Sequence, residues 1–439
     1  MPIEKTGPLP GFSPAEDPSR TDPGKTGLLA KCGPGVISGA ANDDPSCIVS
    51  YAVAGASIGY ATLWTSLYAL PLLATVQLMC ARLGMVSGRG LAGDIRAQFR
   101  PWVLFAMCSS LVLANVVTLG ADLGGMADVT EMITGISGLI WTAVYAVAIL
   151  TMLFYFPYRR LERVFKWLCL VLFAYVVAGV LSHADVHAVM ASTFIPRVSH
   201  SREYLSVLVA IMGATMSPYF LFWQASQQVE EEYCIGRRTL AARKGATRGE
   251  LDSSRVDVFT GAFISKLITY FITLTTAATL FAHGHKHIET ARDAAAALHP
   301  IAGPAAYWLF ALGVVGTGLL AIPTLAGSAA YAVSEAMHWR ASLEEKPILA
   351  PKFYAVLAIS MLLGMSLIYL RFNVVQMLFW ASIFNGILAP PAIALVLLLT
   401  RNPKIMGLHV NSPLLNLFGG LTVVLTSAAA IGLLISFTQ

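Results

Sequence analysis

The sequence predicts an all-α polytopic membrane protein that crosses the bilayer eleven times. Of its 439 residues, 56% are hydrophobic and only 12% are charged, and the mean hydropathy is +0.68. A chain of this composition cannot cover a water-soluble globule with an ordinary charged surface. Two further observations support the prediction: long apolar runs recur along the chain, and basic residues concentrate in alternate connections between them.

Each apolar run is long enough to span a bilayer, which takes roughly 20 helical residues. The runs fall at residues 33–59, 63–81, 102–133, 137–157, 164–182, 204–229, 257–282, 304–337, 353–370, 374–399 and 412–438. The first 30 residues are rich in Pro, Gly, Ser and charge, and they lack the unbroken apolar core of a signal peptide. We therefore expect residues 1–30 to form a disordered tail that is not cleaved.

The positions of the basic residues set the predicted orientation. The tail and the loops after spans 2, 4, 6, 8 and 10 hold 23 of the 29 Lys and Arg residues, whereas the opposite side holds five. The positive-inside rule then places the N-terminus in the cytoplasm and the C-terminus outside. We expect a multi-pass protein of the cell membrane, a monomer or weak oligomer in the lipid bilayer, whose net charge of +5 reflects cytoplasmic loops and not nucleic-acid binding.

Two of the predicted spans are interrupted near the middle. The first contains Asn42–Ser46, with adjacent aspartates before Pro45, and the sixth contains Gly213–Pro218. Irregular backbone at membrane depth is tolerated only where it is buried in protein or lines a cavity, and a carboxylate there costs about 2.5 to 3.5 kcal/mol or more. The interruptions therefore predict a cation site. The alternative is that Pro45 and Pro218 merely kink two ordinary helices.

The spacing of the interruptions predicts an internal repeat. A Gly-Ala pair begins at Gly39 in the first span and at Gly213 in the sixth. Because five crossings precede the sixth span, the second half of the chain enters the membrane from the other side, which is the inverted-repeat plan of secondary transporters with a midplane site. We expect a first repeat at residues 31–200, a second at 201–400, and one additional helix in 401–439.

The residues around both interruptions resemble those of the Nramp family of divalent-metal transporters. The matching stretches are Gly33–Gly35, Gly39–Ser46 and Ala54–Tyr60 in the first span and Gly213–Tyr219 in the sixth, and the resemblance extends from about residue 27 to 400. It implies a LeuT-type fold with an inverted 5+5 helix repeat, and import of metal toward the cytoplasm. It also implies a site built from the aspartate of span 1, a neighbouring side chain and carbonyl, and a carbonyl of span 6 together with a thioether.

The chain departs from this family pattern at three places. Asp44-Pro45-Ser46-Cys47 replaces the family's Asp-Pro-Gly-Asn, Ser217-Pro218-Tyr219 replaces Met-Pro-His, and Gly124-Gly125 stands after Asp122 where the family carries an acid on its proton route. Loss of the thioether hardens the site toward Mg²⁺ and Mn²⁺, and loss of the histidine and the acid weakens the case for proton coupling. These departures resemble the divergent Nramp-related clade that transports Mg²⁺ and Mn²⁺, whose site is thought to admit a partly hydrated ion.

We predict that the transported divalent cation is held by a set of residues from the two interruptions and span 10, namely Asp44, Ser46, Cys47, Ala214, Ser217 and Asn385. Two members of this set have alternative roles. Cys47 is either a soft ligand, which would pull selectivity toward Mn²⁺ or Fe²⁺, or a packing residue. Asn385 either closes over the metal or makes an interhelical hydrogen bond.

Five further residues are secondary candidates. Asp43 is a second carboxylate or a helix cap, and Tyr219 follows Pro218 in the sixth span. Gln224, with Gln227 or Gln228 on the same helical face, lines a cytoplasmic exit path or bonds neighbouring helices. Lys266 pairs with Asp122, replaces the proton route as a fixed cation, or snorkels to the cytoplasmic interface. The acidic run Glu230–Glu232 is expected to be a solvated face.

The sequence contains no motif that predicts an enzyme or a bound cofactor, since it has no phosphate-binding glycine loop, HExxH or CxxC. Transport would then be driven by the ion gradient and the membrane potential, which supplies about 4.6 kcal/mol for a divalent ion crossing 100 mV. The primary hypothesis is import of Mg²⁺ and Mn²⁺ by alternating access without tight proton coupling. The alternatives are a proton-coupled Mn²⁺/Fe²⁺ importer and a sodium-coupled organic-solute symporter on the same fold.

Overall fold

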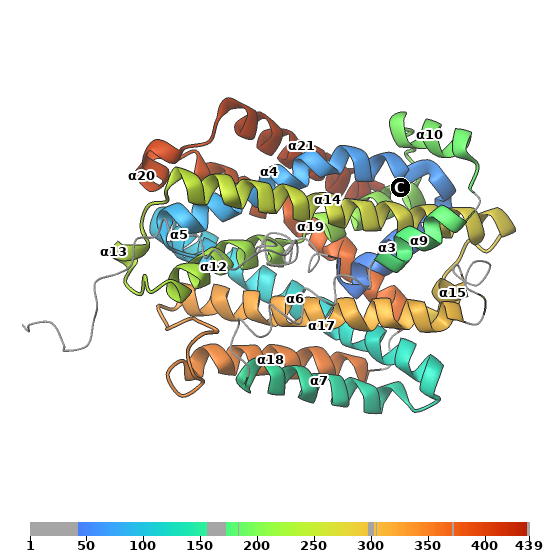
Figure 1. Ribbon diagram of the computed structural model, residues 1–439, viewed down its shortest axis with the longest axis horizontal. Coiled ribbons are helices and arrows are strands. Elements are labelled where there is room, and N and C mark those ends of the chain that lie inside the picture. Colours follow the sequence, from blue (N-terminus) through green and yellow to red (C-terminus); the bar gives the residue numbers. More distant parts are fainter. Residues whose placement is uncertain are drawn as a thin grey trace, which may run out of the picture.

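The computed structural model describes residues 43–155, 173–182, 184–296, 303, 305–370 and 373–436, which form a bundle of helices (Figure 1). The long helices are α3 (Pro45–Ile58), α4 (Leu63–Ser87), α6 (Pro101–Thr134), α7 (Gly138–Tyr155), α11 (Arg202–Thr215), α12 (Pro218–Cys234), α14 (Arg248–Thr279), α17 (Ala305–Ala336), α18 (Pro351–Ile368), α19 (Val374–Thr400) and α21 (Pro413–Ser436). The short ones are η1 (Gly59–Thr62), α5 (Leu91–Gln98), α9 (Phe173–Leu181), α10 (Val186–Phe194), α13 (Leu240–Arg243), η3 (Phe281–His283), α15 (Ala291–Ala296), α20 (Pro403–Met406) and η4 (Gly407–His409).

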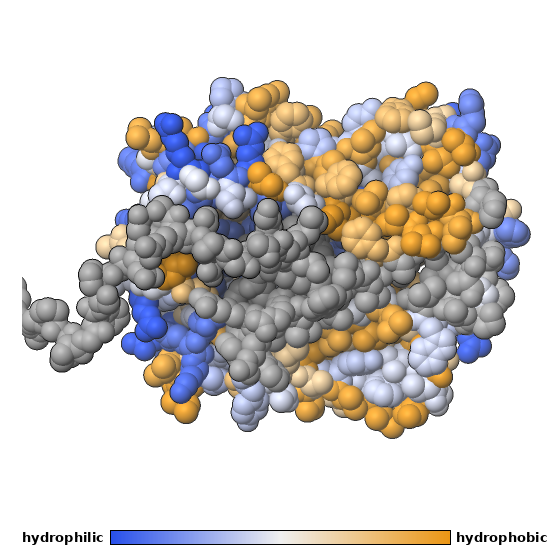
Figure 2. Space-filling model, in the orientation of Figure 1, coloured by the Kyte–Doolittle hydropathy of each residue, from blue (hydrophilic) through white to orange (hydrophobic). Residues whose placement is uncertain are grey.

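Nine helical segments of the described residues are long and apolar enough to cross a membrane. One of them, Pro45–Ser87, combines the predicted spans 1 and 2, because α3, η1 and α4 follow one another directly. The predicted span 5 is described only from α9 onward, so the count of eleven stays a prediction. Apolar side chains such as Val147 and Leu113 are 64% and 56% exposed, and Figure 2 shows hydrophobic residues over much of one side and hydrophilic residues gathered near the α5 and α13 end.

The helices that adjoin the interruptions pack against the centre of the bundle. α6 packs against α17, α18 and α19, while α3 packs against α14 and α19 and α11 packs against α19. Small residues allow the close approach: a methyl group placed on Gly213 of α11 would lie 1.9 Å from the Ser382 carbonyl oxygen, and one placed on Gly55 of α3 would lie 2.0 Å from Thr276 Oγ1. These contacts fix α11 on α19 and α3 on α14.

Some helix ends and two short helices differ from the predictions. α14 begins at Arg248 and not near residue 257, because a capping box of Thr247 and Glu250 starts the helix within polar sequence. α5 and α10 lie in segments expected to be loops, and Asp185 caps α10 by accepting from the backbone N–H groups of His187 and Ala188. The predicted tail 1–30, the stretch 31–42 with its Gly39-Ala40 pair, and residues 164–172 of span 5 lie outside the described residues.

Candidate metal site

Both predicted interruptions coincide with non-helical backbone. α11 ends at Thr215 and α12 begins at Pro218, and between them Met216 has φ −125° and ψ 47°. On the other side, α3 begins at Pro45 and is preceded by the extended residue Asp44. A proline favours the first turn of a helix because it lacks an N–H and its φ is fixed. In span 6 the interpretation as a simple proline kink is therefore wrong. In span 1 the described half begins as a new helix.

Asp44 is the N-cap of α3, and its carboxylate is tightly held. Oδ1 accepts from the backbone N–H of Cys47 and from Ser46 Oγ, both at 2.6 Å, and Oδ2 accepts from the Tyr219 hydroxyl at 3.0 Å. These contacts hold both carboxylate oxygens in place at the start of α3. The cap was predicted for Asp43, and the structure assigns it to Asp44 instead. Tyr219, a secondary candidate, follows the second interruption, and its hydroxyl links that part of the chain to the Asp44 carboxylate.

Asp122 of α6, a secondary candidate, also lies at the N-terminus of α3. The family resemblance had placed this residue on a proton route. Its Oδ1 accepts from the backbone N–H of Ser46 at 3.1 Å, and Asp122 interacts electrostatically with Asp44. Asp122 Oδ2 is buried and has no hydrogen-bond partner in the described parts of the chain. The N-terminus of α3, where N–H groups and the helix dipole favour negative charge, thus gathers two buried carboxylates.

Asp43 and Cys47 face each other beside this cluster. Asp43 Oδ1 accepts from Ser265 Oγ at 2.8 Å and from Cys47 Sγ at 3.7 Å, while Oδ2 is buried and without a partner among the described residues. Cys47 is fully buried in an apolar cluster. A thiol that donates to a carboxylate is protonated, whereas a metal ligand is a thiolate, so the geometry favours the packing role of Cys47 over the ligand role.

The second interruption contributes neutral oxygen atoms. Ser217 Oγ donates to the Gly213 carbonyl at 2.6 Å, which leaves the hydroxyl lone pairs for other contacts. Ala214 lies in the last turn of α11, and Pro218, which has no N–H, begins α12 after the interruption. Met216, next to Ser217, is fully buried in the main hydrophobic cluster. Among the described residues, the Met216 sulfur takes part in no hydrogen bond.

α19 approaches the same region through two polar side chains. Asn385 Nδ2 donates to Thr118 Oγ1 on α6 at 3.0 Å, and its Oδ1 is buried with no partner among the residues the structure describes. Asn385 thus makes the interhelical bond and still offers an oxygen atom. Ser382, one turn earlier, donates to the Ser46 carbonyl at 3.3 Å. Sequence reasoning missed Ser382, although its spacing of three from Asn385 places both on one face of a helix.

Lys266 neither reaches the cytoplasmic interface nor pairs with Asp122. Its exposed fraction is 3%, so it does not snorkel. Nζ donates to the Tyr51 hydroxyl and to Thr215 Oγ1, each at 3.0 Å, while Asp122 accepts from Ser46 N–H alone. The predicted Lys266–Asp122 pair is therefore wrong. The remaining alternative, a fixed cation in place of the proton route, stays a prediction.

Buried amides continue from the site along α12. Gln224 is fully buried, and neither its side-chain oxygen nor its nitrogen has a partner in the described structure; the same holds for Gln77 of α4. α4 packs against α12. Such unpartnered polar groups inside a bundle cost about 1 to 3 kcal/mol each. Their presence supports the exit-path role of Gln224 over a helix–helix bond.

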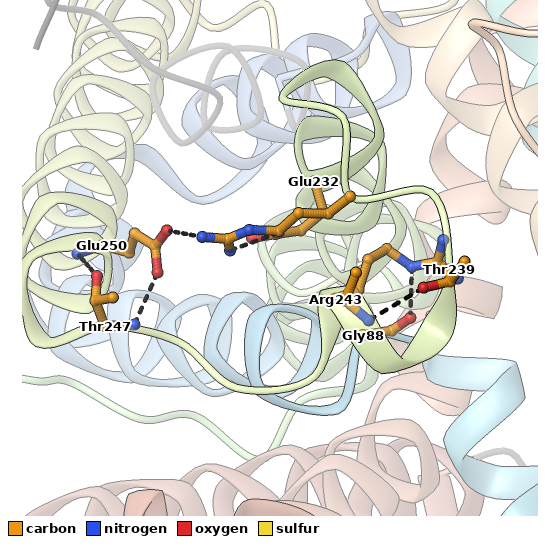
Figure 3. Close-up of polar contacts among 8 residues, drawn as sticks. Gly88, Glu232, Thr239, Arg243, Thr247 and Glu250 are labelled. Atoms are coloured by element: carbon orange, nitrogen blue, oxygen red, sulfur yellow. Dashed lines mark hydrogen bonds and ion pairs between the residues drawn. The ribbon is translucent and has the colours of Figure 1, made fainter. Parts of the chain in front are cut away.

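The acidic residues at the far end of α12 were expected to form a solvated face. Glu230 and Glu232 instead make hydrogen bonds and an ion pair within the protein. Glu230 is buried, 2% exposed, and accepts from the Tyr331 hydroxyl, Ser342 Oγ and Leu343 N–H. Glu232 pairs with Arg237 at 2.7 Å, and Arg237 also pairs with Glu250 of α14 at 3.0 Å (Figure 3). Arg243 Nε donates to the Gly88 carbonyl at 3.2 Å. The connection after α12 thus ties α12, α14 and the end of α4 together.

Within the described ranges, no group of three or more His, Cys, Asp or Glu side chains lies close enough to hold a metal by itself. Any ion at the interruptions would therefore combine carboxylates with hydroxyl, amide and carbonyl oxygens. The four cysteines in the described residues, Cys47, Cys80, Cys108 and Cys234, are free thiols.

The helical arrangement is the LeuT-type fold of secondary transporters. The structure superposes on the crystal structure of the Eremococcus coleocola manganese transporter, in complex with an aromatic bis-isothiourea substituted compound, with a TM-score of 0.73, covering 95% of this chain and 88% of that one at 19% identity. It superposes on MhsT in complex with L-phenylalanine with a TM-score of 0.58, covering 92% and 97% at 14% identity. At these identities the likeness shows a fold shared with membrane transporters.

The sequence profile of the family described as natural resistance-associated macrophage protein-like, or Nramp, matches residues 35–436, and the chain belongs to this family of transporters. It is 29% identical over 442 residues to the "Divalent metal cation transporter MntH" of Pectobacterium carotovorum subsp. carotovorum (strain PC1), which covers 97% of this chain and 98% of that protein. It is 27% identical over 423 residues to the protein of the same name from Yersinia enterocolitica, covering 93% and 95%.

Proposed function

We propose that this protein imports divalent metal cations, Mg²⁺ and Mn²⁺ above others, by alternating access and without tight proton coupling. The observation that carries the proposal is the pair of buried carboxylates, Asp44 and Asp122, held at the N-terminus of α3 opposite the neutral oxygens of the second interruption. The relatives named as divalent metal cation transporters, and the manganese transporter with the same fold, support the class of substrate. The basic loops support an N-terminus in the cytoplasm and a C-terminus outside.

The ion would be held by oxygen atoms of the two interruptions. Asp44 lies between the two interruptions through its bond from Tyr219, and Asp122 Oδ2 and Asn385 Oδ1 are buried atoms without partners in the described structure. Ser46 and Ser217 hydroxyls and the Ala214 carbonyl complete a hard donor set, which suits Mg²⁺ and Mn²⁺. Cys47 stays outside this set because its thiol donates to Asp43. Small side chains leave space for water on an ion that dehydrates reluctantly.

The packing around α6 also supports transport without a proton route. Gly124 follows Asp122 by two residues, and a methyl group placed on it would lie 2.6 Å from Ile368 Cδ1 of α18. A larger side chain at this position would require the Ile368 side chain to move. Gly125 is similarly close, with its added methyl 3.2 Å from Leu378 Cδ1. The packing of glycines against α18 and α19 side chains beyond Asp122 supports the proposal that this part of α6 carries no proton route.

The test is uptake of Mn²⁺ and Mg²⁺ into proteoliposomes that contain a pH indicator and carry an inside-negative potential. We expect uptake that increases with the potential, without matching acidification of the lumen. Asp44→Asn should reduce uptake at least about 100-fold, because it removes the charge that faces the ion. Asp128→Asn, which changes an acid of the same α6 helix that accepts from the Ala291 N–H at 3.3 Å, is the matched control and should transport normally.

Two results would contradict the proposal. Acidification in proportion to metal entry would establish a proton-coupled importer. Uptake of an amino acid or another organic solute in place of metal would establish a symporter, an outcome that the buried carboxylates disfavour because they repel a substrate carboxylate.

A further inference from the structure

Two arginines from neighbouring helices lie at the polar end of the bundle. Arg82 of α4 and Arg255 of α14 act on each other electrostatically. They adjoin a small apolar cluster that contains Leu78 of α4, Val258 of α14 and Leu415 of α21. Arg82 follows Leu78 by four residues and Arg255 precedes Val258 by three, so each arginine lies about one helical turn from the cluster. α4 also packs against α20, which lies at the same end of the molecule as α5 and α13 (Figure 1).

The charge of the two arginines is not cancelled by an acid in the described part of the chain. Arg82 Nη2 donates to the backbone carbonyls of His409 at 2.7 Å and Val410 at 3.4 Å, which carry no net charge. Neither arginine takes part in an ion pair among the described residues. Asp252, the acid one turn before Arg255, is exposed and likewise makes no ion pair within those ranges. The pair is therefore a half-exposed positive site whose Arg82 Nε and Nη1 donors have no partner in the described structure.

Exposed apolar side chains surround this positive site. Next to the His409 carbonyl that binds Arg82, Leu408 in the connection between α20 and α21 is 98% exposed. The two flanking helices expose further large apolar side chains at this end, namely Val256, Phe259 and Phe263 of α14 and Leu414 and Leu417 of α21. Apolar surface that continues into a group of cations is typical of a protein surface at the boundary between hydrocarbon and lipid headgroups.

We propose that Arg82 and Arg255 bind the phosphate of an anionic phospholipid whose acyl chains lie against the exposed apolar side chains of α14 and α21. A guanidinium binds phosphate through charge-assisted hydrogen bonds, and basic sites between membrane helices on the cytoplasmic side bind anionic headgroups. A zwitterionic lipid brings its own cation beside the phosphate, so two uncompensated arginines favour an anionic lipid. The inference goes beyond the proposed function and takes from it only the orientation, which puts the site in the cytoplasmic leaflet.

A soluble phosphate ester shares the headgroup chemistry, and the apolar surroundings favour the lipid. Arg255 directly precedes Val256 on α14, so a headgroup bound to the arginine would have its acyl chains beside the lipid-facing surface of that helix. The contacts of Arg82 with His409 and Val410 also join α4 to the connection before α21. A lipid held by both arginines would therefore bring α14 and this connection together and stabilise the folded protein.

The test is lipid binding to the purified full-length chain in a mild detergent, followed by native mass spectrometry and by the melting temperature. The probes are dioleoylphosphatidylglycerol, dioleoylphosphatidylcholine with the same acyl chains, and glycerol 3-phosphate, which has no acyl chains. We expect the wild type to bind the phosphatidylglycerol at least about fivefold more tightly than the phosphatidylcholine. An excess of glycerol 3-phosphate should not displace the bound lipid, and only phosphatidylglycerol should raise the melting temperature.

Three variants separate the site from the total charge of the protein. Arg255→Gln leaves the hydrogen bonds of Arg82 intact and should weaken phosphatidylglycerol binding about fivefold. The double variant Arg82→Gln/Arg255→Gln should weaken it about 25-fold, with phosphatidylcholine binding unchanged. Arg340→Gln removes an exposed arginine from the connection between α17 and α18 and is the matched control, which should bind lipid as the wild type does.

The inference is overturned if folded Arg255→Gln keeps the affinity of the wild type for phosphatidylglycerol, or if the wild type binds both lipids equally. Displacement of the lipid by glycerol 3-phosphate would overturn it in favour of a site for a soluble anion. Mn²⁺ affinity should be the same in Arg255→Gln and the wild type. A wild type that binds phosphatidylglycerol but no Mn²⁺ would contradict the proposed function and leave the lipid site standing, so the two failures are distinguishable.

Discussion

The buried carboxylates at the interruptions and those at the far end of α12 differ in how completely they are hydrogen-bonded. At the interruptions, Asp43 and Asp122 each keep one oxygen that has no partner among the described residues. At the far end of α12, both oxygens of Glu230 are occupied, by the Tyr331 hydroxyl at 2.5 Å, Ser342 Oγ at 2.9 Å and the Leu343 N–H at 3.0 Å. Both regions are equally buried, so burial alone does not explain the difference.

Asp43 and Asp122 adjoin the proposed metal site, whereas Glu230 joins helices. A buried polar atom without a partner costs about 1 to 3 kcal/mol, so a fold keeps such atoms where something else binds them. A carboxylate with all its partners provided by the protein joins helices, as Glu230 joins α12 to α17. The predictions below follow this comparison, from the largest expected effect on metal binding to the smallest.

The strongest test is Asp122→Asn. The amide oxygen can still accept from the Ser46 N–H, so we expect the fold and the thermal stability to persist. Loss of one of the two carboxylates at the α3 N-terminus should weaken Mn²⁺ binding at least roughly tenfold, measured by calorimetry. Unchanged affinity would place Asp122 outside the metal site and contradict the interpretation of its unpartnered oxygen. Asp128→Asn is again the control.

Ser217→Met changes the kind of ligand at the second interruption. A thioether is softer than a hydroxyl, so the affinity for Cd²⁺ relative to Mg²⁺ should rise by roughly tenfold. Ser217→Leu has a similar size without sulfur and controls for the loss of space and of the Ser217–Gly213 hydrogen bond. Equal selectivity in the two variants would show that position 217 does not face the ion.

Glu230→Ala should lower stability and leave metal binding unchanged, which is the opposite of what we expect for Asp122→Asn. It leaves the Tyr331 and Ser342 hydroxyls without the Glu230 acceptor, which costs about 1 to 3 kcal/mol for each buried group. We expect a lower melting temperature and an unchanged Mn²⁺ affinity. Glu203→Ala, at an exposed acid of α11, should change neither. A loss of transport at full stability would instead put Glu230 on the route of the departing ion.

Much of the fold and the centre of the site could be predicted from the sequence. The long apolar runs predicted the membrane helices, because hydrocarbon selects for them directly. Pro45 and Pro218 marked where helices begin, since a proline removes the N–H that a continuous helix needs. The carboxylate of Asp44 and the small polar side chains beside each proline then identified the cation site as a hypothesis.

What the sequence could not supply was the register of one helix against another. The position of Asp122 at the α3 N-terminus depends on how α6 packs on α3, and the neighbours of Lys266 depend on how α14 packs on both α3 and α11. For the same reason Glu230 was expected in solvent: its partners Tyr331 and Ser342 lie about a hundred residues away in the chain. Side-chain spacing within one helix finds neighbours only within that helix.

The last prediction concerns Asp94 of α5, a buried carboxylate that belongs to neither of the two regions compared above. It lies outside the membrane-spanning helices and is 2% exposed, and Oδ2 has no partner in the described structure. Burial raises its pKa from 3.8 to about 7, with Glu335 adding to the rise and Ser87, Arg89 and Lys244 opposing it. The folded state therefore holds this proton more tightly than the unfolded state.

The sign of the pH effect follows from that raised pKa. Asp94 contributes stability below the unfolded pKa, and this contribution is lost as the pH rises through about 7. The wild type should thus lose a few degrees of melting temperature, on the order of 2 to 4 °C, between pH 6 and pH 8 relative to Asp94→Asn, whose amide does not titrate. Mn²⁺ affinity should be the same in both, because the groups that act on Asp94 are Ser87, Glu335, Arg89 and Lys244, none of which belongs to the proposed metal site. Parallel melting curves at all pH values would show that the Asp94 proton does not contribute to stability.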